Sequence, residues 1–432
     1  MTSSIRRVFT AFAPPAVEKK SDALRFGILG AAKIAPLALV TPAKSHPEVI
    51  IQAVAARDLT RAEEFAKKHG IPDVRGSYEE ILDDPNIDAV LIPLPNGLHF
   101  EWAIRAIRAG KHVLLEKPST SNAFEANILF NLSELSQPNA PVLLEAFHNR
   151  FHPSVHKFRS FIDPADVVHV HTDSMVPWVL TAKDNIEFNY ALSGGSMMNL
   201  GTYNFAILRM IFNADPVECL SCDTSIFGDG IHDKCDYDFK AQFRFPNGGI
   251  AEATTTLRGS IFWKPSEARV TMREVVVPDK SLPEDQEKVR SRQITLHGFI
   301  HAFIWHRIDV KDTFVILDTV DGSPVKRWVE STSHKAYTYQ EAGGEFGDLP
   351  GEDWWMSYRY QLEEFVNRVK GRPTQYWVEG QDSWNQMKMI DMAYEKSGLG
   401  VRPTTDNEWS GAGIGRFEWV RNTISNLSTL AR

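Results

Sequence analysis

The segment Glu116-Lys117-Pro118 follows the apolar run 112–115 and places a lysine just beyond it. Such a run is typical of a buried strand in a parallel sheet, and these sheets present ligand-binding side chains at the carboxyl ends of their strands. A flexible ammonium in that position can hold and polarise a hydroxyl or carbonyl oxygen, and it can transfer a proton if its pKa is lowered. The residues therefore favour redox chemistry at an alcohol.

Elements of alternating type surround this lysine. Residues 24–30 (LRFGILG) predict a strand that ends in glycine, and residues 33–45 can begin a helix. Further strands are expected at 49–56, 88–94, 112–116 and 141–147, and helices at 60–69, 98–109 and 122–135. A repeated strand-helix-strand order predicts a doubly wound parallel sheet of the Rossmann type.

The pattern changes after Phe151. Strand-like runs follow one another, several joined by turn sequences, and residues 201–212 form a helix-like run between them. We therefore predict an α/β protein: a dinucleotide-binding Rossmann domain at 24–148 and an α+β domain at 149–432 with a large open, mostly antiparallel sheet. Residues 1–23 are expected to form a flexible arm, and the polar stretch 278–293 an exposed insertion.

Composition restricts the function classes. A chain of 432 residues exceeds one usual hydrophobic core, and its net charge of −8 argues against a nucleic-acid binder. No apolar run is long enough to cross a bilayer. The three cysteines lack a second pair with metal-binding spacing, so we expect reduced thiols, no metal site and a cytoplasmic protein that acts on a small molecule.

The glycine-rich fingerprint of a pyrophosphate loop is incomplete. In register with Gly-x-Gly-x-x-Gly the chain has Gly30, Ala32 and Ala35, so a methyl group stands where the backbone normally approaches the phosphates. Arg57 follows the second predicted strand, where NAD-selective proteins usually carry a carboxylate. Its guanidinium can pair with a 2′-phosphate, which favours NADP(H) over NAD(H).

Six segments together resemble one family: GILGAAKIA, AVAARD, PLPNGLHFEW, AGKHVLLEKP, EAFHNRFHP and GGSMMNLGTY. They are similar to the Gfo/Idh/MocA oxidoreductases, and nearest to the branch of the dimeric dihydrodiol dehydrogenases and the NADP-dependent D-xylose dehydrogenases. The resemblance extends from about residue 24 to about residue 399. It implies hydride transfer between a nicotinamide and the carbinol carbon of a sugar, polyol or diol.

The resemblance also implies roles for individual residues. Lys117 matches the lysine that binds substrate and takes part in proton transfer. Tyr203 matches the acid/base tyrosine, and we expect the nearby ammonium to acidify its phenol. Asn199, four residues before Tyr203, stands where an aspartate is usual. The lost carboxylate predicts a lower pKa for Lys117 than in relatives. The residues assigned to the cofactor are Gly30, Ala32, Lys33, Ile34, Arg57, Pro95, Asn96, His99, Glu116 and Lys117.

Two alternatives remain open at this point. Ala32 and Asn199 are also compatible with a non-catalytic NADP-binding sensor of the same fold. A secondary-metabolism enzyme could use the cofactor without net redox change. In each case we expect a homodimer or homotetramer formed through the C-terminal sheet, because an open sheet with an exposed apolar face usually pairs with another copy.

Overall fold

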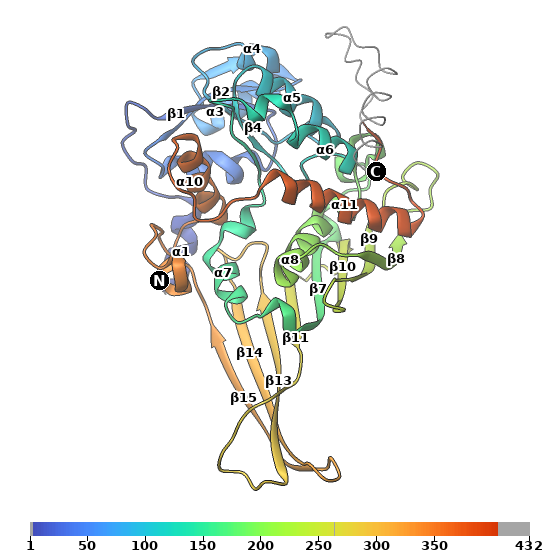
Figure 1. Ribbon diagram of the computed structural model, residues 1–432. Coiled ribbons are helices and arrows are strands. Elements are labelled where there is room, and N and C mark those ends of the chain that lie inside the picture. Colours follow the sequence, from blue (N-terminus) through green and yellow to red (C-terminus); the bar gives the residue numbers. More distant parts are fainter. Residues whose placement is uncertain (1–2, 263, 405–432) are drawn as a thin grey trace.

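The computed structural model describes residues 3–262 and 264–404. Two sheets, with helices between and around them, make up this part of the chain (Figure 1). The first is the parallel sheet expected from the sequence, with strand order β3-β2-β1-β4-β5-β6. Its strands are β1 (Leu24–Leu29), β2 (Val49–Ala55), β3 (Asp73–Arg75), β4 (Ala89–Ile92), β5 (His112–Leu115) and β6 (Leu143–Glu145).

Helices connect these strands and cover both faces of the sheet. They are α2 (Thr41–Lys44), α3 (Leu59–His69), α4 (Tyr78–Leu82), α5 (His99–Arg108) and α6 (Ala123–Phe130). Helix α3 begins because the Asp58 carboxylate accepts a hydrogen bond from the Arg61 N–H, and it ends at Gly70 in the left-handed conformation. The first predicted helix differs from the expectation. A π-helical turn, η1 (Pro36–Val40), precedes a short α2, and each has a proline in its first turn.

The second sheet has nine strands and is mostly antiparallel, with β10 and β7 as a parallel pair. Its strands are β7 (Val167–Pro177), β8 (Glu218–Ser225), β9 (Asp238–Arg244), β10 (Ile250–Gly259), β11 (Glu267–Met272), β12 (Val275–Val276), β13 (Gln286–His297), β14 (Arg307–Asp318) and β15 (Pro324–His334). The α/β architecture predicted from the sequence is therefore confirmed.

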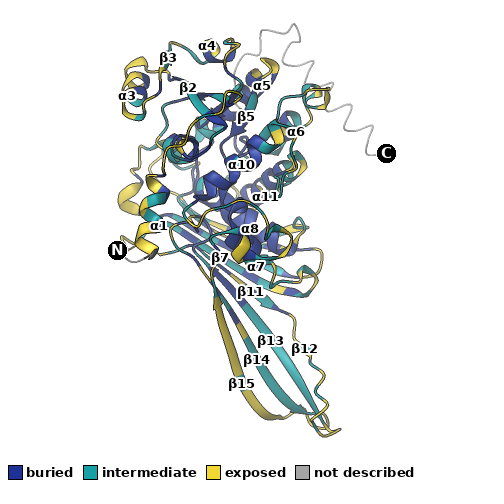
Figure 2. Cartoon of the chain, turned by 90° about the vertical axis from the view of Figure 1, so that its left-hand side faces the viewer, coloured by how far each residue is buried: buried dark blue, intermediate teal, exposed yellow. Residues whose placement is uncertain are grey.

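The strands β13, β14 and β15 extend as a long ribbon away from the body of the molecule (Figure 2). The segment 278–293, expected to be an exposed insertion, enters this ribbon, since β13 begins at Gln286. Strand β15 was not predicted. It lies at the edge of the sheet and most of its residues are exposed, so its sequence carries no alternation between apolar and polar positions.

The helices that follow the first sheet in the chain pack between the two sheets or beside the second. They are α7 (Pro153–Arg159), α8 (Thr202–Phe212), α9 (Tyr339–Ala342), α10 (Ser357–Val369) and α11 (Gly380–Ser397). Helix α11 packs against α6 on one side and against α8 and β8 on the other. A single apolar cluster runs through this region and includes residues of both sheets. No helix within 3–262 or 264–404 is long and apolar enough to span a bilayer.

The N-terminal segment, expected to be a flexible arm, contains helix α1 (Ser3–Phe12). Arg7 is buried in this helix. Its guanidinium donates to the carbonyl oxygens of Phe303 and Ile304, and it lies 3.6 Å from the centroid of the Tyr337 ring. One arginine with three partners therefore attaches the segment to the second domain.

The open face of the second sheet is polar over β7, β9 and β10, where the sequence led us to expect an apolar surface. Glu252 accepts a hydrogen bond from Gln242 at 2.7 Å and lies 3.4 Å from His171 on the neighbouring strand. Alternate positions on β10, such as Ala251 and Ala253, face inward and are fully buried. The inward face is therefore the apolar one, and the open face is stabilised by cross-strand polar pairs.

Candidate functional site

The loop after β5 is held from two sides. The Lys117–Pro118 peptide bond is cis. The ring of His99 lies between two carbonyl oxygens, with Nδ1 2.8 Å from that of Pro118 and Nε2 2.8 Å from that of Leu94. His99 is almost completely buried and joins the loop after β4 to the loop after β5. Both ring nitrogens of His99 therefore have backbone partners, and its assignment to the cofactor stays a prediction.

Lys117 and Tyr203 lie together, although they are far apart in the chain. The Lys117 Nζ is 4.8 Å from the centroid of the Tyr203 ring. The same ammonium donates a 2.8 Å hydrogen bond to the backbone carbonyl of Asn199. Asn199 belongs to a π-helical turn, η9 (Met197–Gly201), that leads into α8. The main chain of Asn199, and not its side chain, therefore provides the contact with the lysine.

Burial has the largest effect on the pKa of Lys117. It lowers the pKa of Lys117, and the carboxyls of Glu116, Glu187 and Glu145 offset part of that effect. Burial raises the pKa of Glu116 to about 7, while the Lys117 ammonium opposes the rise. The main cause of the lowered pKa of Lys117 is desolvation, and the expected difference from relatives that carry the aspartate stays a prediction.

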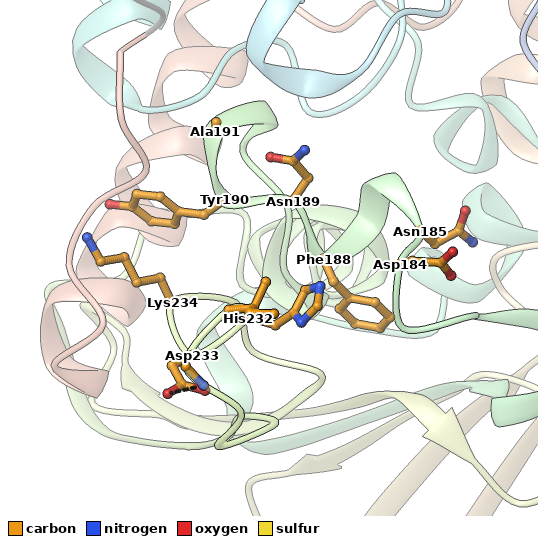
Figure 3. Close-up of a pocket in the computed structure, with 11 residues that line it drawn as sticks. Asp184, Asn185, Phe188, Asn189, Tyr190, Ala191, His232, Asp233 and Lys234 are labelled. Carbon is orange, nitrogen blue, oxygen red and sulfur yellow. Dashed lines mark hydrogen bonds between the residues drawn. The ribbon is translucent and has the colours of Figure 1, made fainter.

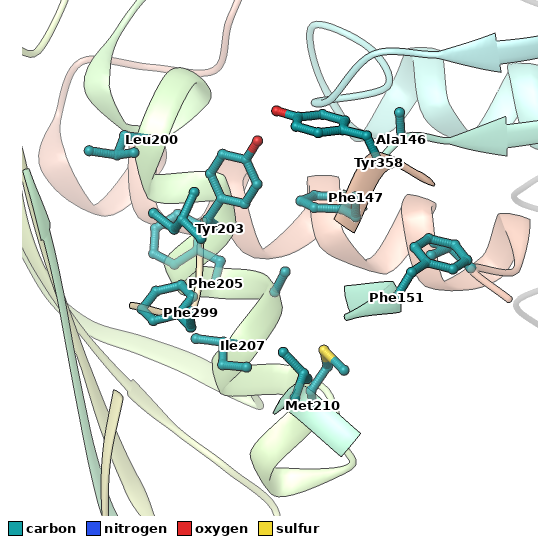
Figure 4. Packing of buried hydrophobic residues seen from close by; sticks show 14 of the residues in the cluster. Ala146, Phe147, Phe151, Leu200, Tyr203, Phe205, Ile207, Met210, Phe299 and Tyr358 are labelled. Carbon is teal, nitrogen blue, oxygen red and sulfur yellow. The ribbon is translucent and has the colours of Figure 1, made fainter. Parts of the chain in front are cut away.

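The expected acidification of Tyr203 is not found. Burial raises the pKa of its phenol well above the ordinary value, and Tyr358 and Glu116 add to the rise. The ammonium lies over the ring, 4.8 Å from its centroid, and its hydrogen bond goes to the Asn199 carbonyl and not to the phenol. Tyr203 is 6% exposed and packs edge-on against Phe147, at the end of an apolar cluster (Figure 4).

Sequence reasoning missed His148 and Ser357. The Tyr203 hydroxyl lies 3.0 Å from Nε2 of His148, and Nδ1 of His148 lies 2.7 Å from Oγ of Ser357. Its position could have indicated His148, because this residue lies in the segment EAFHNRFHP shortly after the end of β6. Ser357 begins α10, far along the chain, and no local pattern connects it with the site.

The side chains assigned to the cofactor follow the carboxyl ends of neighbouring strands. The Gly30 N–H donates to the Ala55 carbonyl at 2.7 Å, so the turn after β1 lies beside Arg57 after β2. Gly30 has φ +118°, and a Cβ there would lie 3.0 Å from a methyl group of Leu94. Ala32 and Ile34 are half-buried, while Lys33 and Arg57 are exposed cations. These residues fit a nucleotide phosphate, since two positive groups flank a turn that requires glycine.

Two other residues assigned to the cofactor lie in the loop after β4, and one of them bonds to a loop of the second domain. Pro95 and Asn96 follow β4, and the Asn96 amide donates to the Ser193 carbonyl at 3.0 Å. The loop that contains Ser193 also lines a cavity of about 500 Å³ (Figure 3). The residues around this cavity are Asp184, Asn185, Phe188, Asn189, Tyr190, Ala191, Gly230, Ile231, His232, Asp233 and Lys234. Neither Lys117 nor Tyr203 belongs to its lining.

A buried ion pair anchors the helix of the site. The Asp236 carboxylate accepts hydrogen bonds from the Ser196 hydroxyl (2.6 Å), the Met197 N–H (2.9 Å) and the Tyr394 hydroxyl (2.9 Å). It also pairs with Arg402 at 3.2 Å, and both charged side chains are 0% exposed. Ser196 and Met197 start the turn that carries Asn199, so this carboxylate fixes the beginning of the site helix.

We expect Asp236→Asn to lower the free energy of unfolding by about 3–5 kcal/mol, because it leaves the buried Arg402 charge without its partner. Denaturant unfolding followed by circular dichroism measures the change. Asp223→Asn, at an exposed position on β8, is the matched control and should stay within about 0.5 kcal/mol. Equal midpoints for the two variants would contradict the role given to Asp236.

Within the described residues no group of three or more His, Cys, Asp or Glu side chains is arranged to hold a metal ion. The cysteines Cys219, Cys222 and Cys235 are free thiols, as expected. The site is therefore built from an ammonium, a phenol and an imidazole beside the carboxyl edge of a parallel sheet. Fold and site together define the class of Rossmann-domain proteins with a second α+β domain.

The chain belongs to the Gfo/Idh/MocA family. Residues 24–137 match the family of oxidoreductases with an NAD-binding Rossmann fold, and residues 165–269 match the GFO/IDH/MocA C-terminal domain. Together the two matches cover about half of the chain. The family resemblance inferred from the sequence motifs is thus confirmed.

Relatives of known name are similar over just under half of the chain. A D-xylose 1-dehydrogenase (NADP(+)) from Haloferax volcanii is 37% identical over 203 residues, which are 46% of this chain and 61% of the relative. The trans-1,2-dihydrobenzene-1,2-diol dehydrogenase of Sus scrofa is 33% identical over 220 residues, 49% of this chain and 62% of the relative. The similarity thus spans less than two thirds of either relative.

Solved structures share the fold over most of the chain. KijD10, a 3-ketoreductase from Actinomadura kijaniata in complex with NADP and TDP-benzene, superposes with a TM-score of 0.64 at 20% identity. The alignment covers 87% of this chain and 98% of that one. An aldose-aldose oxidoreductase from Caulobacter crescentus gives a TM-score of 0.63 at 18% identity, with the same coverage.

Proposed function

We propose that this protein is an NADP-dependent oxidoreductase that transfers a hydride between the nicotinamide and a carbinol or carbonyl carbon of a sugar, polyol or diol. The observation that carries the proposal is the meeting of Lys117 and Tyr203, 4.8 Å from nitrogen to ring centroid, beside the edge of the sheet where dinucleotides bind. The dehydrogenases of Haloferax volcanii and Sus scrofa support the same reaction class by their names.

Each residue then has a role. NADP supplies or accepts the hydride when it is bound. Lys117 holds the substrate oxygen, and its lowered pKa reduces the cost of sharing a proton with that oxygen. Tyr203 exchanges the hydroxyl proton. Asn199 acts through its carbonyl, which orients the lysine in place of a carboxylate. The turn from Gly30 to Ile34 and the residues Pro95, Asn96 and Glu116 border the nucleotide.

Arg57 sets the choice between NADP(H) and NAD(H) in this proposal. We expect Arg57→Asp to weaken NADPH binding by about 10- to 100-fold, because a charge-assisted hydrogen bond contributes about 1.5–3 kcal/mol. NADH binding should be kept or improved. Quenching of tryptophan fluorescence during titration with each nucleotide measures both affinities. Arg327→Asp, on the exposed strand β15, is the control. A parallel loss of both nucleotides would contradict the 2′-phosphate contact.

One experiment separates the candidate functions. The purified protein is first titrated with NADPH and NADH, then incubated with NADP and D-xylose, other aldoses or a trans-diol while the absorbance of the reduced nicotinamide is followed. Reduction of NADP supports the dehydrogenase. Tight binding without turnover of any substrate supports an NADP-binding sensor. Conversion of a substrate with no net change in nicotinamide supports an enzyme that uses the cofactor transiently.

Self-association through the C-terminal sheet stays a prediction. The edge strand β15 has unpaired backbone groups along its outer side, which a second copy can pair with. The polar open face of β7, β9 and β10 supplies hydrogen-bonding and charged groups instead of an apolar patch.

A further inference from the structure

The hydroxyl group of Tyr203 is directed at an imidazole. His148 Nε2 lies 3.0 Å from that oxygen, whereas the Lys117 ammonium lies over the ring face and donates to the Asn199 carbonyl. Any proton that Tyr203 passes on through the hydrogen bonds of this structure therefore goes to or comes from His148.

Both ring nitrogens of His148 face hydroxyl groups. Nδ1 lies 2.7 Å from the Ser357 hydroxyl, which completes a row from Tyr203 through His148 to Ser357. The buried histidines His99 and His306 differ, since both nitrogens of each ring bond to backbone groups. Backbone partners fix a ring for packing. Hydroxyl partners can exchange protons with the ring, because they both donate and accept.

The surroundings of His148 favour its neutral form. The side chain is fully buried and stacks on the Tyr358 ring, with 3.8 Å between centroids, and on the His301 ring, with 5.7 Å. The charged or titratable groups around it are Tyr203, Tyr358, Lys117, His301 and His152. Burial lowers the pKa of His148 well below its ordinary value, and His301, Lys117 and His152 lower it further. The ring is thus neutral at neutral pH, with one nitrogen that carries a proton and one that accepts a hydrogen bond.

We propose that His148 is a positioning residue and the proton acceptor behind Tyr203, with Nδ1–H donated to Ser357 and the lone pair of Nε2 directed at the phenol. The inference rests on the proposed function for its chemical consequence. In the oxidative direction the substrate hydroxyl proton moves to the Tyr203 oxygen, while the phenol proton moves to Nε2. Bound NADP would accept the hydride of the carbinol carbon, which leaves a carbonyl. Tyr203 is neutral before and after, and His148 ends as an imidazolium.

Transfer of the proton to His148 means that the buried Tyr203 need not form a phenolate. Tyr203 is 6% exposed, so a phenolate formed by proton loss to solvent would be poorly hydrated. Concerted transfer to His148 avoids that ion. The positive charge then lies on a ring whose Nδ1–H retains the Ser357 hydroxyl as acceptor.

The first test needs no turnover. Protein labelled with ¹⁵N-histidine is examined by NMR between about pH 6 and 8, with the His148→Gln spectrum identifying the His148 signals. We expect a neutral ring with the proton on Nδ1 and no titration in this range. Tyr203→Phe should shift the Nε2 resonance, and His156→Gln, which replaces another buried histidine, should not. A proton on Nε2, or a signal that titrates as an exposed histidine does, would overturn the proposal.

The second test is the pH profile with NADP and whichever of D-xylose or a trans-diol is oxidised. With His148 neutral, the rate should be flat over the same pH range. In His148→Gln the proton must leave as a free phenolate, whose population rises about tenfold per pH unit below the phenol pKa, so the rate should fall about 10- to 100-fold at neutral pH and rise with pH. Ser357→Ala should give a smaller loss. A uniform loss at every pH in His148→Gln would show that the ring is structural.

The two tests also separate two failures. If the unsubstituted protein oxidises none of these substrates while NMR gives the Nδ1–H form, the proposed function is wrong and the Tyr203–His148 arrangement stands. If turnover occurs and the pH profile of His148→Gln stays flat, the proposed function stands and the role given to His148 is wrong.

Discussion

Lys117→Met should reduce the rate of NADP-linked oxidation by about 10²- to 10⁴-fold, the range contributed by a positioned acid/base group. Methionine keeps the length and apolar stem of lysine but removes the ammonium. The Asn199 carbonyl then loses its donor, and the substrate oxygen loses the group proposed to hold it. Initial rates, followed through the absorbance of the reduced nicotinamide, measure the effect.

Two measurements make the Lys117 result specific. Lys311→Met, at an exposed position on β14, should keep the native rate. NADPH titration should show that the Lys117 variant still binds nucleotide, because Arg57 and the turn after Gly30 are unchanged. A Lys117→Met protein with native turnover would remove the lysine from the mechanism, whatever the behaviour of Tyr203.

Tyr203→Phe should lower the same rate by about 10²- to 10³-fold, since it deletes the hydroxyl that exchanges the substrate proton and keeps the ring. The edge-on contact with Phe147 and the position under Lys117 need only the ring, so the fold of the site should persist. The variant leaves His148 Nε2 without its partner, which should cost about 1–3 kcal/mol of stability.

Tyr339→Phe is the matched control for this variant. Its phenol is also buried and donates to a carbonyl oxygen, that of Phe151, at 3.0 Å. Both substitutions therefore remove one buried hydroxyl, and their midpoints in chemical denaturation should fall by similar amounts. Only Tyr203→Phe should lose turnover. If the two variants were equally active, the phenol of Tyr203 would have no chemical role.

The two proposed roles depend on different partners. Lys117 is held by a backbone carbonyl, so its position survives many side-chain changes. Tyr203 is held by His148 and by the apolar cluster behind it (Figure 4). We therefore expect the activity to be more sensitive to substitutions around Tyr203 than to changes at Asn199, which bonds to the lysine through its backbone carbonyl.

Local sequence patterns determined much of the fold. Apolar runs of strand length separated by amphipathic segments predicted the first sheet, because buried parallel strands leave that continuous signal. The Glu116-Lys117-Pro118 segment drew attention to the lysine at the end of a buried strand. The same patterns failed where an element has no buried face, as in β15, or where proline and a π-helical turn interrupt the expected helix, as at 36–44.

The composition of the site was decided by tertiary structure. Sequence motifs paired Lys117 with Tyr203, but not with the Asn199 carbonyl, since any residue type presents a carbonyl and only the π-helical turn directs this one. His148 and Ser357 come from segments 209 residues apart. The protonation of Tyr203 and Glu116 depends on burial, which the packing of both domains creates. Residue types determine which chemistry is available here, and only the folded chain decides which groups touch and how much water they retain.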